Sequence, residues 1–404
     1  MVGRGKELQI SIAGAGIGGL AAAALLAKAG HRFTVYDQFD APRPVGSGLV
    51  IQPVGQMVLD AVGAGDAARA MGAPLRRMLG HEARTGRPVL DVRYDWRGTG
   101  RHRAAQGGTG LAIHRAALFD CLLRSALNAG ANLQSAAEIT GHQSGTLLFQ
   151  NSIRSPPADL IIDAAGAHSP LSPLKSRPLP YGAIWGTVDW PTDSTLPRDE
   201  LRQTYRAANR MLGVLPIGLI PGDPKPKAAI FWSLPATSHD RWLSQGLDAW
   251  KTEATTLWPA FAPFAAQITD PAQMTMARYS HGSLAKPCAP GIAHIGDAAH
   301  RASPQLGQGA NMTLLDALAL AQAIKQANGQ DPLHLYAQAR RWHVRTYQAF
   351  SAAFTPQYQS DSRFLPVLRD RLLFPASQIG PMPRVLSALV CGTMIPPLGS
   401  LTRP

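Results

Sequence analysis

The sequence is short of cysteine, of acidic residues and of long apolar runs, and each shortage argues against a class of protein. Its three cysteines, Cys121, Cys288 and Cys391, lie far apart in 404 residues and show no Cys-x-x-Cys spacing. So few thiols argue against a disulfide framework and a zinc site, and they favour a reducing, cytoplasmic setting. No stretch stays apolar over the roughly 20 residues that a membrane span requires, so we expect no stable membrane insertion.

Acidic residues are outnumbered by basic ones: 39 lysines and arginines face 26 aspartates and glutamates, for a formal net charge of +13. A positive field of this kind gathers anionic ligands. The basic residues are scattered along the chain and form no run of the length that nucleic-acid recognition uses. We therefore interpret the charge as help in binding small anions such as pyridine nucleotides, and we expect no nucleic-acid partner.

The chain is too long for one compact core, and its alternating strand-like and helix-like segments predict an α/β fold. Strand-like runs at 183–190, 211–220 and 228–234 indicate an inserted β-sheet unit, whereas residues 111–127 have helical periodicity. We expect a monomer or homodimer. The expected parts are a Rossmann-like nucleotide-binding unit (1–76, 102–176 and 281–330), a substrate-binding β-sheet domain (77–101 and 177–280) and a C-terminal helical region (331–404).

A glycine-rich turn near the start of the chain separates a strand-like segment from an alanine-rich helix. Gly14, Gly16 and Gly19 match the pattern Gly-x-Gly-x-x-Gly, in which the glycines allow a tight turn, the approach of a pyrophosphate, and close packing of the helix on the strand. The phosphates would lie at the helix N-terminus. Asp37 ends the second strand, 21 residues after Gly16, at the spacing of a ribose-binding carboxylate. This loop alone does not distinguish FAD from NAD.

A second stretch, from His294 to Asp316, is the most informative in the chain. A strand ends near Asp297, whose carboxylate is suited to binding a polyol hydroxyl. Gly307 and Gly309 then allow the backbone to approach a flat ligand. The helix that follows points its first amides back at this turn, where they would stabilise negative charge on a reduced ring system.

This stretch resembles the second FAD signature of the single-component flavin monooxygenases, the aromatic-ring hydroxylases that are similar to p-hydroxybenzoate hydroxylase. The family pattern is Gly-Asp-Ala-Ala-His, then Pro, then Gly-x-Gly, then Asn and an acidic-Ala pair. Residues 43–48, and Arg115 with the leucines after it, resemble further family segments. The resemblance implies a glutathione-reductase-type FAD-binding domain with an inserted β-sheet domain. The matching residues are Gly296, Asp297, Ala298, Ala299, His300, Pro304, Gly307, Gly309, Asn311, Asp316 and Ala317.

The resemblance also implies that FAD is the cofactor, and it gives roles to particular residues. The first glycine loop and Asp37 would bind the ADP half, Arg43 and Arg115 the phosphate and ribityl region, and Pro304 and Gly307 would lie near the isoalloxazine. His300 and His168 are expected to be structural rather than catalytic. The expected cofactor-binding residues are Gly14, Ala15, Gly16, Ile17, Gly19, Asp37, Gln38, Arg43, Gly48, Arg115, Asp297, Pro304, Gly307, Gly309, Ala310, Asn311 and Met312.

The chemistry implied by the resemblance belongs mostly to the cofactor. In this family NADH or NADPH reduces FAD, O2 adds at flavin C4a, and the hydroperoxide transfers one oxygen atom to an aromatic or quinone-like small molecule. The sequence shows no Ser/His/Asp or metal-ligand constellation, and this chemistry requires none. The candidates for the substrate pocket, each also compatible with a plain core position, are Gln52, Tyr181, Trp185, Met211, Leu215 and Phe231.

Other functions of the same superfamily remain open. A halogenase would be expected to carry Trp-x-Trp-x-Ile-Pro, and Trp185 and Trp190 are too far apart for that motif. A flavin-dependent reductase or dehydrogenase remains an alternative, as does a non-catalytic FAD-binding protein.

One family motif is altered. Where the family has Asp-Gly, a motif associated with FAD and NAD(P)H binding, this chain has Ala165-Gly166, and the nearest acid is Asp163. Ala165 cannot supply a side-chain hydrogen bond. We expect a subfamily variant that binds FAD but holds its reductant differently, with Asp163 on the strand face of Ala165 if the extended pairing continues that far.

Overall fold

Strands from three distant parts of the chain form a largely parallel sheet. The computed structural model, which describes residues 7–40, 47–94, 108–150 and 152–401, begins with β1 (Gln9–Ala13), α1 (Ile17–Lys28) and β2 (Arg32–Tyr36). β1 pairs in parallel with β2 and with β11 (Leu160–Asp163), and β18 (Ile292–His294) follows β11. The carboxyl ends of these strands meet along one edge, where such sheets bind their ligands. The edge strands are β8 (Asn132–Gln134) and β17 (Cys288–Ala289).

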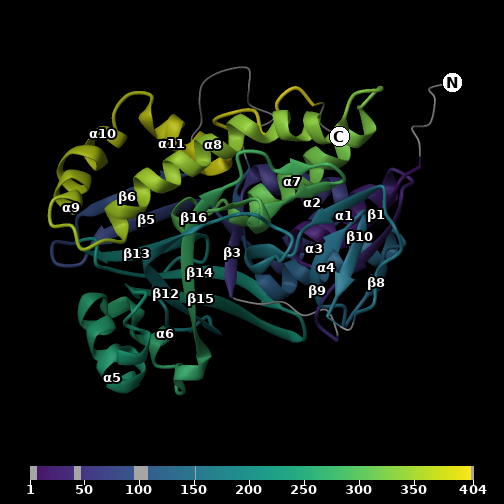
Figure 1. Cartoon of the computed structure of the whole chain (residues 1–404). Coiled ribbons are helices and arrows are strands. Elements are labelled where there is room, and N and C mark those ends of the chain that lie inside the picture. Colours follow the sequence, from purple (N-terminus) through teal and green to yellow (C-terminus); the bar gives the residue numbers. More distant parts are fainter. Residues whose placement is uncertain (1–6, 41–46, 95–107, 151, 402–404) are drawn as a thin grey trace.

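Helices bury this sheet (Figure 1). Helix α1 is buried from Gly18 to Leu26, because its alanines let the neighbouring helices approach closely. The surrounding elements are α2 (Pro53–Val62), α3 (Gly65–Met71), α4 (Arg115–Asn128), α7 (Gly309–Lys325), a small sheet of β3 (Gly48–Ile51), β7 (Gly110–His114) and β4 (Ala73–Leu75), and a hairpin of β9 (Ile139–Gln143) and β10 (Thr146–Phe149).

The helix predicted over residues 111–127 is wrong at its start. Residues Gly110–His114 form β7, and the helix begins only at Arg115. β7 pairs antiparallel with β3 on one side and with β4 on the other. These two partners stabilise an extended conformation that local periodicity does not reveal.

The second unit is an eight-stranded sheet, and all but one of its strand pairs are antiparallel. Its order is β19-β16-β12-β15-β14-β13-β5-β6, with β13 and β5 as the parallel pair. The sheet therefore joins the strands after residue 177 to two strands that precede residue 94. The strands are β5 (Arg77–Glu82), β6 (Pro88–Arg93), β12 (Arg177–Asp189), β13 (Glu200–Arg206), β14 (Arg210–Ile220), β15 (Asp223–Pro235), β16 (Met274–Ser283) and β19 (His300–Arg301).

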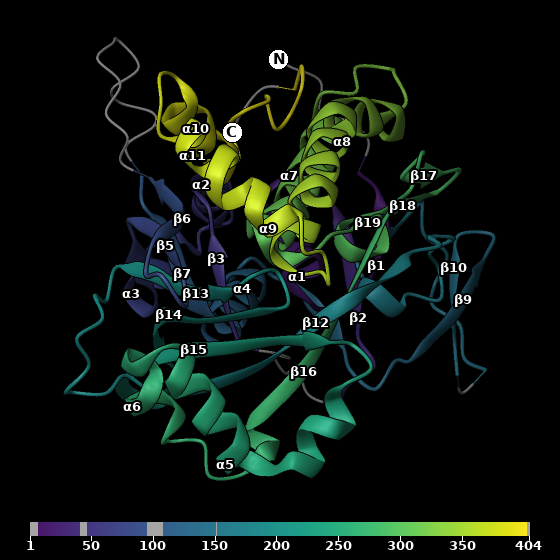
Figure 2. The same cartoon turned by 90° about the vertical axis from the view of Figure 1, so that its left-hand side faces the viewer.

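Helices cover both faces of this sheet (Figure 2). One face packs on α5 (His239–Leu257) and α6 (Ala262–Ala265), through Trp242 and Trp250 among others. The sequence interpretation found only strands in this part of the chain and so missed α5. Helix α5 was hard to recognise because Gly246, with a non-helical φ of 79°, interrupts its helical periodicity midway.

The opposite face packs against the first unit and the C-terminal helices. Helix α8 (Pro332–Tyr358) lies along α7, and the short segments after it fold over β6 and α8. Within the described residues, no helix is both long and apolar enough to cross a bilayer. The remaining segments are α9 (Leu365–Leu368), a π-helical turn η6 (Arg369–Leu373), α10 (Phe374–Ser377) and α11 (Met382–Cys391).

A buried ionic network joins α7 to α8. The Asp316 carboxylate accepts a hydrogen bond from Arg340 Nε at 2.7 Å, lies 2.6 Å from His300 Nε2, and accepts one from the Gly296 amide at 2.9 Å. Burial by itself would raise the pKa of Asp316, but His300 and Arg340 lower it to about 2. His300 therefore has the structural surroundings expected for it.

We predict that Arg340→Met destabilises the protein by about 3–5 kcal/mol, because it leaves a buried carboxylate without its guanidinium partner. Urea unfolding followed by circular dichroism measures this change. The control is Arg341→Met, which removes an exposed guanidinium whose Cζ lies 5.3 Å from the ring centroid of Trp342 and should change stability by less than about 1 kcal/mol. Equal losses in the two variants would contradict a special role for the buried network.

Candidate functional site

The glycine-rich turn after β1 is shaped by close backbone contacts. Gly14 has a φ of +98°, and a Cβ there would lie 2.6 Å from the carbonyl oxygen of Ala164. A Cβ at Gly19 would lie 1.9 Å from the Gly14 oxygen, so the third glycine permits close packing of helix on strand. Gly16 differs, because a Cβ there would meet no atom within 4 Å. The backbone is thus tightly packed at Gly14 and Gly19, whereas at Gly16 it is exposed to solvent.

Asp37 lies beside this turn, directly after β2. Its Oδ2 accepts a hydrogen bond from the Ala15 amide at 2.7 Å, and its Oδ1 accepts one from Phe39 at 3.1 Å. The carboxylate therefore orients the glycine turn in addition to any contact with a ligand. Ile17 is half-buried at the start of α1, and Gln38 is exposed.

The second glycine turn lies between η5 (Pro304–Leu306) and α7. Gly307 has a left-handed conformation with a φ of 60°, which favours glycine. Gly309, like Gly16, is exposed and has open space where a Cβ would be. Pro304 is exposed on the same turn, whereas Ala310 is half-buried. The backbone of this turn is therefore accessible to a flat ligand.

Two of the predicted cofactor-binding side chains point inward instead. Asn311 is fully buried and accepts a hydrogen bond from the Gln52 amide at 2.7 Å while donating to the carbonyls of Val50 and Gly307 at 3.1 and 2.9 Å. Met312 is also buried, with its sulfur 3.5 Å from Arg340 Nη2. Asn311 braces the turn against the segment that begins α2, and Met312 is part of the core.

The side-chain amide of Gln52 is hydrogen-bonded through its oxygen but not through its nitrogen. Its Oε1 accepts a hydrogen bond from the Tyr94 hydroxyl at 2.7 Å, but its buried Nε2 has no partner among the described residues. That Nε2 lies 3.2 Å from the position that a Cβ of Gly307 would occupy. A buried donor beside the second glycine turn needs an acceptor, and a ligand on that turn is able to supply one.

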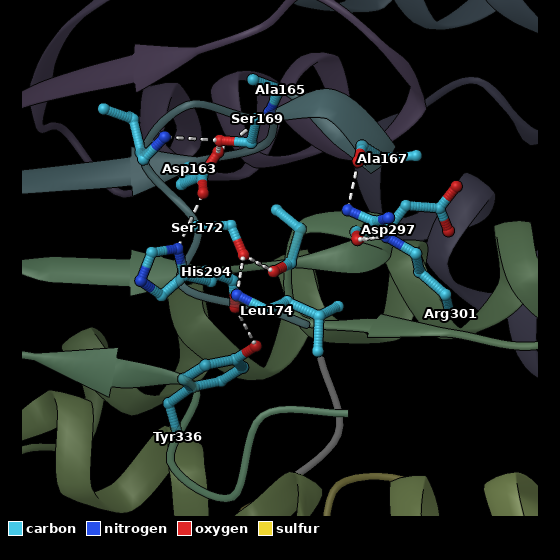
Figure 3. Close-up of polar contacts among 12 residues, drawn as sticks. Asp163, Ala165, Ala167, Ser169, Ser172, Leu174, His294, Asp297, Arg301 and Tyr336 are labelled. Carbon is cyan, nitrogen blue, oxygen red and sulfur yellow. Dashed lines mark hydrogen bonds and ion pairs between the residues drawn. The ribbon is translucent and has the colours of Figure 1, made fainter. Parts of the chain in front are cut away.

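The remaining predicted contacts differ in their surroundings. Arg115 is exposed at the first position of α4, and Arg43 lies outside the described residues. Gly48 has a packing role, because a Cβ there would lie 2.4 Å from the side chain of Ile217 in the large sheet. Asp297 is exposed, and its carboxylate points away from its neighbours (Figure 3).

The altered third motif forms the turn after β11 (Figure 3). Strand β11 ends at Asp163, and Ala165 is the N-cap of a 3-10 turn, η1 (Gly166–His168). The extended pairing therefore stops before Ala165, and the condition for a shared strand face is not met. Asp163 is fully buried, with Oδ2 2.7 Å from His294 Nδ1 and Oδ1 accepting from Ser169 Oγ at 2.7 Å and the Ala165 amide at 3.2 Å. Its carboxylate is used inside the protein and does not replace an acid at position 165.

A guanidinium links this turn to the second glycine stretch. Arg301 donates to the carbonyl of Ala167 in the altered motif, to the carbonyl of Asp297 at 3.0 Å and to Ser176 Oγ at 3.0 Å. Ser172 Oγ adds a hydrogen bond to the Ala298 carbonyl at 2.5 Å (Figure 3). His168, as expected, is an exposed residue of the turn. The two ligand-facing stretches are thus held together without an acid at position 165.

One face of the large sheet carries apolar side chains, and they connect to the second glycine turn through Tyr94, the hydrogen-bond partner of Gln52. The Trp185 and Phe231 rings, on β12 and β15, lie 4.5 Å apart between centroids. Met211 is in the same cluster as Phe231, while Leu215 packs with residues of β3 and β7. Trp185 packs against both clusters and so lies between them.

Sequence reasoning missed Tyr279, a polar residue beside Trp185. Its hydroxyl accepts a hydrogen bond from Trp185 Nε1 at 2.9 Å. Burial raises the pKa of Tyr279 to about 12, against the opposing effects of the Trp185 hydrogen bond and the Arg115 charge. Tyr181, which was a candidate, instead donates to Asp361 Oδ1 at 2.5 Å and holds the chain after α8. Side chains alternate between the two faces of β16, so the sequence would have suggested Tyr279 if the pairing register of β16 with β12 had been known.

The fold and site define a dinucleotide-binding protein with room for a flat ring at a second glycine turn. Both openings match such a group, because Gly16 and Gly309 leave space for close approach and Gln52 offers an unpaired donor. Residues 7–351 match the family described as FAD binding domain, and the chain belongs to that family. FAD is therefore the cofactor, as the resemblance implied, and the ambiguity between FAD and NAD left by the first loop is resolved.

Similar proteins with named activities match most of the chain. It is 24% identical over 328 residues to the FAD-dependent urate hydroxylase of Klebsiella pneumoniae, covering 78% of this chain and 81% of that protein. It is 26% identical over 386 residues to a probable 2-heptyl-3-hydroxy-4(1H)-quinolone synthase of Rhodococcus erythropolis, covering 91% of both. The Klebsiella pneumoniae HpxO structure with FAD and uric acid superposes with a TM-score of 0.77 at 20% identity, over 96% of each chain. The predicted α/β fold, a Rossmann-like FAD domain with an inserted sheet, is confirmed.

We predict that two glycines of the first loop respond differently to valine. Gly16→Val should weaken FAD binding by about tenfold or more, because the side chain fills the open approach, while the unfolding free energy of the apoprotein changes by less than about 1 kcal/mol. Gly14→Val should destabilise the apoprotein by about 2 kcal/mol or more, since its φ is positive and its Cβ clashes with Ala164. Fluorescence titration with FAD and thermal unfolding separate the two effects. Full FAD affinity in Gly16→Val would contradict the proposed approach of the pyrophosphate.

Proposed function

We propose that this protein is an FAD-dependent monooxygenase that uses NADH or NADPH and O2 to insert one oxygen atom into an aromatic or quinone-like small molecule. The observation that carries the proposal is the contact between the FAD-binding turns and an aromatic part of the large sheet: Tyr94, which donates to Gln52 beside the second glycine turn, belongs to the cluster against which Trp185 packs. The relatives include hydroxylases of urate and of 3-hydroxybenzoate, and their activities support the same reaction class.

The role of each binding residue follows from its position. The open glycines Gly16 and Gly309 would let the pyrophosphate and the ring system approach, and the exposed Asp297 carboxylate would bind the ribityl chain. Gln52 Nε2 would donate to a ring acceptor. FAD, once reduced, supplies the reactivity toward O2. The protein holds the ring and excludes water from its far side.

The substrate would lie between the second glycine turn and the sheet. Trp185 and Phe231 offer flat apolar contacts, and Met211 and Leu215 extend that surface. Tyr279 is a polar group beside Trp185, and its hydroxyl is protonated at neutral pH as in any tyrosine, so it is available to donate to a substrate oxygen. These features favour an aromatic ring with few charges on the side that faces the sheet.

The test is oxygen transfer by the purified FAD-loaded protein. NADH and NADPH are each added with aromatic acids, phenols and quinone precursors, and FAD absorbance, O2 consumption and product mass are followed. We expect one reductant to bleach the flavin and one substrate to gain a single oxygen atom from isotopically labelled O2. Substrate reduction without labelled oxygen would instead establish a reductase or dehydrogenase. FAD that neither nucleotide reduces, with every compound tested, would identify a non-catalytic FAD-binding protein.

The altered third motif generates a separate prediction about the reductant. Ala165→Asp should change the KM for NADH or NADPH by about fivefold, the equivalent of one hydrogen bond of about 1 kcal/mol, while the Kd for FAD changes less. Ala165→Asn is the control, since it adds a side chain of the same shape without charge. Steady-state kinetics and FAD titration make the comparison. An effect confined to FAD retention would show that the turn contacts FAD rather than the reductant.

A further inference from the structure

A groove lies at the junction of the large sheet and the C-terminal helices, away from both glycine turns. Its volume is about 760 Å³, which is within the range of small-molecule sites. Its walls are the turn between β5 and β6, the turn between β13 and β14, the end of α5, and α9 to α10, at the end of the molecule opposite α1 (Figure 1). Five arginines line it: Arg84, Arg87, Arg206, Arg363 and Arg371.

The positive charge of this groove is only partly neutralised. Arg206 lies 3.2 Å from Glu253 and the charge of Arg84 acts on Glu82, but Arg87, Arg363 and Arg371 form no ion pair among the described residues. Two acidic residues, Glu82 and Asp370, also line the groove, and the carboxylate of each already accepts hydrogen bonds from neighbouring protein groups. Glu82 Oε2 accepts from the amides of Arg84 and Thr85 at 3.1 and 2.8 Å, and Asp370 Oδ1 accepts from Arg369 Nε at 2.6 Å.

The wall made by the C-terminal helices is firmly attached. Arg369 is almost fully buried, with its guanidinium 5.1 Å from the ring centroid of Tyr205 and 5.0 Å from that of Tyr358. It also donates to the Gln357 carbonyl at 2.8 Å. Because Tyr205 belongs to β13, this contact fixes the helical wall to the sheet. The groove is thus a built feature of the fold.

The lining between the arginines is apolar. Leu257, Val367 and Phe374 contribute side chains, and Val367 remains 48% exposed. The buried Val89 lines the groove and also belongs to the apolar cluster of Met211 and Phe231. One layer of side chains therefore separates this groove from the sheet face that is proposed to meet the substrate.

We propose that the groove binds an amphipathic anion, with a phosphate or carboxylate head group among the arginines and an apolar body along Leu257, Val367 and Phe374. Guanidinium groups bind both kinds of head group through paired, charge-assisted hydrogen bonds. The apolar lining contributes by removing ligand surface from water. The lining of the groove includes no residue of either glycine turn, so its ligand would be bound apart from FAD.

The test measures binding of dodecyl phosphate, held below its micelle concentration, to the FAD-loaded protein by isothermal titration calorimetry. We expect one site per chain, and we expect Arg363→Gln combined with Arg371→Gln to weaken it by about tenfold or more, because two charge-assisted contacts are lost. The matched control is Arg384→Gln, an exposed arginine of the same C-terminal region outside the groove, which should leave the affinity unchanged. Inorganic phosphate alone should bind at least about tenfold more weakly than dodecyl phosphate.

Two further arms identify the source of the ligand. Cosedimentation with phosphatidylglycerol vesicles that is lost in the double variant would point to a membrane lipid, and dodecyl phosphate binding without cosedimentation would point to a free amphiphile. Either result supports the groove. Unchanged dodecyl phosphate affinity in the double variant, equal weakening in Arg384→Gln, or equal affinity for inorganic phosphate would overturn the proposal. Because the readout is binding, it stands or falls separately from oxygen transfer.

Discussion

The absence of side chains at the carboxyl edge of the parallel sheet is the constraint on which the rest of the site depends. A dinucleotide reaches the backbone only where no Cβ intervenes, and Gly16 and Gly309 provide the two open positions. Around them the packing is close, since Gly14 and Gly19 touch neighbouring backbone. The packed glycines therefore fix the conformation of the backbone around the accessible ones, and the edge of the sheet is preorganised for its ligand.

Preorganisation of the second turn depends on buried polar groups rather than on apolar packing. Asn311 ties the turn to the start of α2, and the Asp316–Arg340 pair fixes the helix that follows. Such groups need precise partners, because each unpaired buried atom is unfavourable. The exceptions at this turn are Gln52 Nε2, Gln305 Nε2 and Gln308 Oε1, which have no partner among the described residues, and a ring on the turn would give the Gln52 donor an acceptor.

The sequence could predict the parts of the site that depend on backbone and could not predict those that depend on tertiary register. Glycine spacing identified both turns, because glycine lacks a Cβ and its positions in the sequence show directly where a ligand is able to approach the backbone. It gave no indication that the side chains of Asn311 and Met312 point inward, since which arc of α7 is buried depends on its packing against α2 and α8. Tyr279 and Trp185 are 94 residues apart and meet only through the pairing of β12 with β16. Helix α5 was missed because Gly246 interrupts its periodicity, and β7 was missed because its partners are distant in sequence.

The altered third motif shows how an interface tolerates the loss of an expected acid. An aspartate at position 165 would stand next to the buried Asp163, whose Oδ1 already accepts the amide of that residue. Placing two carboxylates so close in a partly buried turn is unfavourable, so an acid at Asp163 and an acid at position 165 are poorly compatible. With Asp163 paired to His294 and Ser169, the turn is fixed from inside, and Arg301 fixes it from outside through backbone carbonyls. The acid of this stretch, Asp163, thus serves the fold from the end of the strand, and the turn at position 165 is held without a carboxylate of its own.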